Sequence, residues 1–163
     1  MLSKRPVLSV FFPSCSTIES RCATRGTHHS FDDHPPLDVV VIPGGNTTQE
    51  MRNPATIAWL EKVMRQTRIN TSVCTGAFLP GKVGLLDGHT VTTHWSMLDQ
   101  LAKSFPHARV QRDVRWVDED VLVTAAGISA GLDMSLHLVE RLLGREVAER
   151  TAHYLEYTRD EKA

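Results

Sequence analysis

The sequence predicts an α/β fold, a three-layer sandwich in which helices cover both faces of a mainly parallel sheet. Strand-like and helix-like segments alternate along the chain from residue 37 onward. The segment 37–42 is an almost continuous apolar run, which is typical of a parallel strand buried on both faces. A length of 163 residues suits one domain. We therefore expect a single domain over residues 1–163.

A helix over residues 54–67 follows this first buried strand. Asn53 suits the position that caps a helix, and Pro54 suits the first helical turn. Apolar side chains recur at helical spacing and predict a face that points into the core. These side chains are Ile57, Leu60 and Met64.

The middle of the chain continues the alternation with a strand over 69–73 and a helix-like segment over 77–86. Pro80 lies inside that segment, where proline removes a backbone hydrogen bond and clashes with the preceding turn. We therefore expect this helix to be kinked or to start late. A short strand over 89–93 and a helix over 95–105 follow.

The last third predicts a hairpin and two helices. Strands over 109–117 and 121–125 flank an acidic turn at 118–120. An amphipathic helix then ends at Gly144, and a final helix runs through about Tyr157. The apolar stripe of the first helix consists of Leu132, Leu136, Val139, Leu142 and Leu143.

Composition argues against several classes of partner. The chain carries 18 basic and 19 acidic side chains, a net charge of −1, which argues against a nucleic-acid or anionic-membrane partner. No apolar run approaches a membrane span, and the apolar stretch at the start is too short for a signal peptide. Three cysteines without paired spacing do not form a disulfide framework. We therefore expect a cytoplasmic protein in a reduced compartment.

Cys74 is the most informative residue, because it lies between a strand and a helix-like segment. The pattern Ser72-x-Cys74-x-Gly76 resembles a nucleophile elbow with cysteine as the nucleophile. The N–H groups and positive dipole end of the next helix favour a thiolate there. Buried cysteines that pack as small hydrophobes also follow strands, so local sequence leaves both interpretations open.

A glycine pair, Gly44 and Gly45, follows the strand 37–42 at its carboxyl end, where ligands bind in open parallel sheets. Its backbone N–H groups are suited to an anion or a developing oxyanion. We expect the N–H groups of Gly45 and Thr75 to form an oxyanion hole beside the Cys74 sulfur. A loop that merely needs a positive φ angle is the alternative.

Other polar residues suggest less. His28, His29 and His34 lack the spacing of metal ligands, so we expect a solvated loop, no metal and no cofactor. Cys15 and Cys22 lie in the same amino-terminal region, without support for a redox role. Asp133 opens the amphipathic helix and is expected to complement the helix dipole.

Several motifs together resemble the PfpI/ThiJ superfamily, in the branch that contains isocyanide hydratase. The resemblance covers residues 31–157 and implies a flavodoxin-like fold of the class I glutamine-amidotransferase type. The motifs are residues 38–45, 73–78, 84–88, 92–95 and 124–133.

The resemblance also implies an acid in the loop after the first strand, hydrogen-bonded to the cysteine. Glu19 stands at this position, six residues after Pro13; a surface glutamate is the alternative. Family members have a helix and another strand after the acid, but only 17 residues separate Glu19 from Leu37 here. The chain is therefore expected to be shortened near its amino terminus. The resemblance further implies a supporting role for His94 beside Cys74; a polar strand-end residue packed beside Trp95 is the alternative.

The activity implied is that of a cysteine-dependent enzyme on a small-molecule substrate. Its specific form is hydration of isocyanides to N-formamides through a Cys74 thioimidate, and a cysteine hydrolase or deglycase is a close variant. A non-catalytic domain that senses a ligand or oxidation is the alternative, since related domains occur fused to transcriptional regulators and an exposed thiolate is readily oxidised. By analogy with the family, we expect a homodimer.

Overall fold

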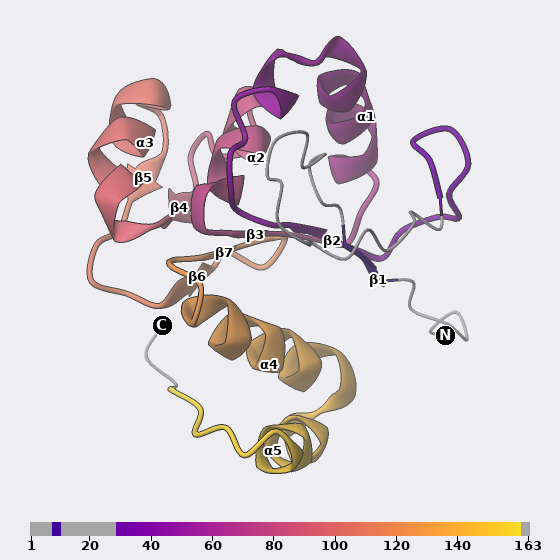
Figure 1. The fold of residues 1–163 in the computed structure, drawn as a ribbon, viewed down its shortest axis with the longest axis vertical. Helices are drawn as coiled ribbons and strands as arrows, with labels where there is room; N and C mark the ends of the chain where they lie inside the picture. Colours follow the sequence, from indigo (N-terminus) through magenta and orange to yellow (C-terminus); the bar gives the residue numbers. More distant parts are fainter. Residues whose placement is uncertain (1–7, 11–28, 161–163) are drawn as a thin grey trace, which may run out of the picture.

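A five-stranded sheet runs through the centre of the structure, a computed structural model that describes residues 8–10 and 29–160 (Figure 1). Its first four strands in space are mutually parallel, and only the last, β6, is antiparallel to its neighbour β7. This arrangement confirms the mainly parallel sheet. In spatial order the strands are β1 (Leu8–Val10), β2 (Val39–Ile42), β3 (Ile69–Val73), β7 (Leu122–Ala125) and β6 (Trp116–Asp118).

Helices cover both faces of the sheet and complete the three layers (Figure 1). One face carries the 3₁₀ helix η1 (Glu50–Arg52), α1 (Pro54–Met64) and α2 (Phe78–Lys82). The opposite face carries α4 (Ala130–Leu143), and α5 (Arg145–Tyr154) packs against α4 (Figure 1). The remaining elements are the 3₁₀ helices η2 (Cys74–Ala77) and η3 (Trp95–Met97), α3 (Leu98–Ser104), and a small parallel sheet of β4 (Thr90–Val91) and β5 (Arg109–Val110).

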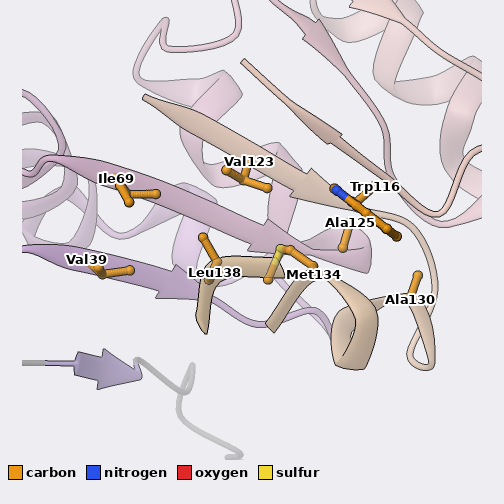
Figure 2. Close-up of a cluster of buried hydrophobic side chains, with 8 residues drawn as sticks. All are labelled: Val39, Ile69, Trp116, Val123, Ala125, Ala130, Met134 and Leu138. Atoms are coloured by element: carbon orange, nitrogen blue, oxygen red, sulfur yellow. The ribbon is translucent and has the colours of Figure 1, made fainter. Parts of the chain in front are cut away.

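Two apolar layers hold the helices on the sheet, because neighbouring side chains of β2 point to opposite faces. Val39 packs in the layer beneath α4, where Figure 2 shows Met134 and Leu138 of the helix directed at the sheet. Val40 and Ile42 pack in the other layer against α1 and α2. The continuous apolar run of β2 therefore reflects burial on both sides.

The signals at helix ends are confirmed. The Asn53 side chain accepts a hydrogen bond from the Ala55 N–H at 3.0 Å, and Pro54 occupies the first turn of α1. Gly144 ends α4 with a φ of 94°, a conformation that glycine adopts without steric cost.

The predicted strand over 109–117 is wrong, because the chain divides it between two sheets. Its first part is β5, which pairs with β4, and only its end joins β7 in a hairpin as β6. Between them Asp113 has a φ of 58°, which an extended strand cannot contain. The segment 77–86 likewise holds only the short helix α2, and the turn after it passes through Gly84 at a φ of 77°.

A charged cluster fastens α4 to the β6–β7 hairpin. Asp118 on β6 lies 2.6 Å from the His137 Nε2 and accepts two hydrogen bonds of 2.9 Å from the Arg141 guanidinium. Burial of the Asp118 carboxyl opposes its ionisation, but His137, the backbone N–H of Asp120 and Arg141 outweigh this and hold its pKa below the usual 3.8. The cluster thus favours a charged Asp118 in the folded protein.

Stability should depend on this carboxylate in a pH-dependent way. Since the folded-state pKa of Asp118 is lowered, its contribution is present above about pH 4 and is lost as the pH falls through the folded-state value. We expect Asp118→Asn to reduce the free energy of unfolding at pH 7 by about 1.5–3 kcal/mol, and by less below pH 4. Urea unfolding at both pH values measures this.

Asp99→Asn is the matched control, because Asp99 pairs with Arg112 on the surface and its side chain is 90% exposed. Its substitution should change stability little at either pH. An equal loss for Asp118→Asn at pH 7 and at pH 3 would contradict a role for the ionised carboxylate.

Candidate active site

Cys74 occupies a sharp turn at the carboxyl end of β3. Its φ is 57°, a left-handed conformation that is costly for a residue with a Cβ and persists where surrounding contacts impose it. The Cys74 N–H donates to the Ala126 carbonyl at 2.8 Å, and the Thr93 hydroxyl donates to the Cys74 carbonyl at 2.6 Å. The side chain is half-buried, so the turn presents a thiol at the edge of the sheet.

Two glycines allow the Cys74 turn and the segment after β2 to approach each other closely. A Cβ at Gly44 would lie 2.7 Å from the Cys74 Cβ and 3.2 Å from its Sγ. A Cβ at Gly76 would lie 2.5 Å from the Ile42 carbonyl oxygen. Contacts below 3.0 Å require the backbone to shift, so both positions need glycine for close packing.

The Thr75 hydroxyl joins the glycine loop to the cysteine turn. It accepts a hydrogen bond from the Gly45 N–H at 2.9 Å and donates to the Gly45 carbonyl at 2.8 Å. Gly45 has a φ of 125°. The N–H group predicted to donate to an oxyanion is therefore bonded to Thr75 in this structure, which brings Gly44, Gly45, Cys74 and Thr75 together as one unit.

His94 follows the strand β4 as predicted, and its partners are local. Its side chain accepts from the Ser96 N–H, and its Nδ1 lies 2.8 Å from the Ser96 hydroxyl. Its imidazole ring lies 5.5 Å from the ring of Trp95. On the other side, a Cβ at Gly127 would lie 3.4 Å from the His94 Cδ2. His94 thus stands between η3 and the chain that follows β7.

A buried ion pair that was not predicted from the sequence stabilises the segment that follows β7. Asp133 is fully buried and is paired with Arg115, which also donates to the Ser129 hydroxyl at 3.3 Å. Asp133 further accepts from the Tyr157 hydroxyl at 3.1 Å and from the Asp160 N–H at 2.9 Å. The expected role of Asp133, complementing the helix dipole, is therefore incomplete, because its main partners lie outside α4.

Several residues singled out from sequence fall outside the described residues, namely Glu19, Cys15, Cys22 and His28. Within residues 8–10 and 29–160, no group of three or more potential metal ligands is present, and no helix is long and apolar enough to cross a membrane. The expected solvated histidine loop is wrong at His34, whose Nε2 accepts from the Trp59 indole at 3.0 Å.

Comparison with known proteins settles the family. Residues 24–141 match the sequence profile of the DJ-1/PfpI family. The chain belongs to this family. An isonitrile hydratase from Pseudomonas putida is 37% identical over 129 residues, which cover 78% of this chain and 55% of that protein. The HTH-type transcriptional regulator GbdR of Pseudomonas aeruginosa is 31% identical over 128 residues, 78% of this chain and 35% of the regulator.

Solved structures confirm the fold. A THiJ/PfpI family protein from Pseudomonas syringae superposes with a TM-score of 0.73 at 34% identity, over 80% of this chain and 54% of that one. Drosophila melanogaster DJ-1beta has a TM-score of 0.68 at 23% identity, over 78% and 67% of the two chains, and shares the fold. The chain spans about half the length of the isonitrile hydratase and a third of the regulator.

The reactivity of Cys74 should depend on the absence of a Cβ at Gly44. We expect Gly44→Ala to lower the rate of Cys74 alkylation by iodoacetamide at least tenfold, because the new methyl group displaces the cysteine turn. Mass spectrometry of the Cys74 peptide measures the rate. Gly127→Ala is the control, since its Cβ meets only His94 at 3.4 Å; equal rates in both variants would contradict the packing argument.

Proposed function

We propose that this protein is a cysteine-dependent enzyme that hydrates isocyanides to N-formamides, with Cys74 as the nucleophile. The observation that carries the proposal is the half-buried Cys74 thiol on a turn of φ 57°, against the loop of Gly44 and Gly45. Similarity to the isonitrile hydratase of Pseudomonas putida supports the choice of substrate class.

The reaction proceeds in two steps through a covalent intermediate. The Cys74 thiolate forms a bond to the terminal isocyanide carbon while that carbon takes a proton from Glu19, which gives a thioimidate. Water then adds to the same carbon, the nitrogen takes up a proton, and the C–S bond breaks. Thiolate and N-formamide are released, and the second proton of water returns to Glu19.

The glycine loop, Gly44 and Gly45, has a positioning role in this scheme. Thr75 holds Gly45 through two hydrogen bonds, so the loop stays against Cys74 while charge develops on the substrate. The Gly45 and Cys74 N–H groups are already bonded to the Thr75 hydroxyl and the Ala126 carbonyl, so the Thr75 N–H is the group of this turn that we propose stabilises that charge. Gly44, Gly45 and Thr75 organise the polar end of the substrate. His94 has a supporting role beside Cys74.

Substitution of the two reactive groups tests the proposal. We expect Cys74→Ala to abolish hydration of cyclohexyl isocyanide, because no thioimidate can form, and Glu19→Gln to lower kcat by about 10²–10⁴-fold, the usual contribution of a general acid. Formamide release followed by chromatography is the measurement. Cys15→Ala and Cys22→Ala are matched thiol controls and should retain activity. Undiminished turnover by Cys74→Ala would refute the mechanism.

A second candidate function is ligand or oxidation sensing without turnover, which the similarity to the regulator GbdR favours. Mild peroxide treatment followed by peptide mass spectrometry separates the two: selective oxidation of Cys74 together with no turnover of any isocyanide would favour a sensor. A cysteine hydrolase or deglycase would use the same nucleophile on a carbonyl carbon. The small-molecule substrate, a homodimer and a cytoplasmic location remain predictions.

A further inference from the structure

The chain after α5 turns back and lies against α4. Glu156 has a φ of 51°, a left-handed conformation of the kind that commonly ends a helix, and the Tyr157 N–H donates to the Ala152 carbonyl at 3.0 Å. The segment that follows, yellow in Figure 1, runs from α5 toward the start of α4. We call residues 157–160 the strap.

Two carboxylates of α4 hold the strap. Asp133 lies fully buried in the first turn of α4, and its Oδ1 accepts from the Tyr157 hydroxyl at 3.1 Å and from the Asp160 N–H at 2.9 Å. About two turns further along α4, Glu140 pairs with the Arg159 guanidinium at 2.5 Å, and the Arg159 side chain is 10% exposed. Hydrogen bonds to charged groups are the stronger class in proteins, so these contacts fix the strap on the helix.

The other oxygen of Asp133 leads toward the cysteine turn. Its Oδ2 accepts from the Arg115 Nε at 2.6 Å. The Arg115 carbonyl accepts from the Ala126 N–H at 2.9 Å, and the Ala126 carbonyl accepts from the Cys74 N–H at 2.8 Å. A continuous series of contacts therefore runs from the strap through Asp133 and Arg115 to Cys74.

The Cys74 turn needs support of this kind, because a left-handed cysteine persists where its surroundings impose that conformation. Without the strap, the Asp133 Oδ1 would lose both of its donors. A buried carboxylate that lacks donors is costly, so Asp133 and the paired Arg115 would move toward water. The Ala126 carbonyl would then no longer be held in place, and the Cys74 turn could relax.

We infer that the strap is a conformational device that holds the Cys74 turn in its reactive conformation, with Tyr157 as a positioning residue that acts through Asp133. The inference goes beyond the proposed function, because it concerns the turn and the thiol and applies to an enzyme and to a sensor alike. Any change that releases the strap lowers the reactivity of Cys74 without altering the residues around the sulfur.

Hydrogen exchange followed by NMR tests this on the full chain with Tyr157→Phe, which keeps the ring and removes the hydroxyl. We expect the Cys74 and Ala126 amides to exchange about tenfold faster, the effect of losing one hydrogen bond to a charged acceptor. Alkylation of Cys74 by iodoacetamide should slow at least threefold. The Asn70 N–H donates to the Val121 carbonyl at the other end of β3, and its exchange rate should stay within about twofold of wild type.

Tyr154→Phe is the matched control, because Tyr154 is 89% exposed at the end of α5. It should change neither exchange nor alkylation. Unchanged exchange at Cys74 and Ala126 in Tyr157→Phe would overturn the inference. An equal increase at Asn70 and Cys74 would also overturn it, because that pattern indicates a general loss of stability. None of these measurements requires turnover, so a protein that hydrates no isocyanide refutes the proposed function alone.

Arg159→Gln provides a second test, which decides the matter should Tyr157→Phe fold poorly. This substitution removes the pair with Glu140 and leaves the donors to Asp133 in the chain. We expect the same selective pattern with a smaller change, about threefold faster exchange at Cys74 and Ala126. If Arg159→Gln leaves both amides at the wild-type rate in that case, the strap does not support the turn and the inference is wrong.

Discussion

The ion pair between the buried Asp133 carboxylate and Arg115 is the interaction on which the architecture around Cys74 depends. A charge removed from water needs partners, and Asp133 finds them in Arg115, Tyr157 and the backbone of Asp160. Burial, followed by the hydrogen bond to Asp133, raises the pKa of the Tyr157 hydroxyl above its usual 10.0. One carboxylate therefore joins the start of α4, the chain before β6 and the segment after α5.

This ion pair is linked to Cys74 by two backbone hydrogen bonds in series. The Arg115 carbonyl accepts from the Ala126 N–H at 2.9 Å, and the Ala126 carbonyl accepts from the Cys74 N–H at 2.8 Å. A left-handed cysteine costs on the order of 1–3 kcal/mol and persists only where its surroundings impose it. The Ala126 bond, the Thr93 bond and the close approach of Gly44 supply that constraint.

The helix ends could be predicted from the sequence, because each depends on a few neighbouring residues. Asn53 with Pro54 gave the start of α1, and Gly144 gave the end of α4, because caps and left-handed turns depend on few residues. The Arg115–Asp133 pair spans 18 residues without a pattern that points to it, and an aspartate in a first helical turn has a sufficient local explanation. The segment 109–117 is divided because β5 pairs with β4. This is a tertiary contact that the strand propensity of the segment cannot predict.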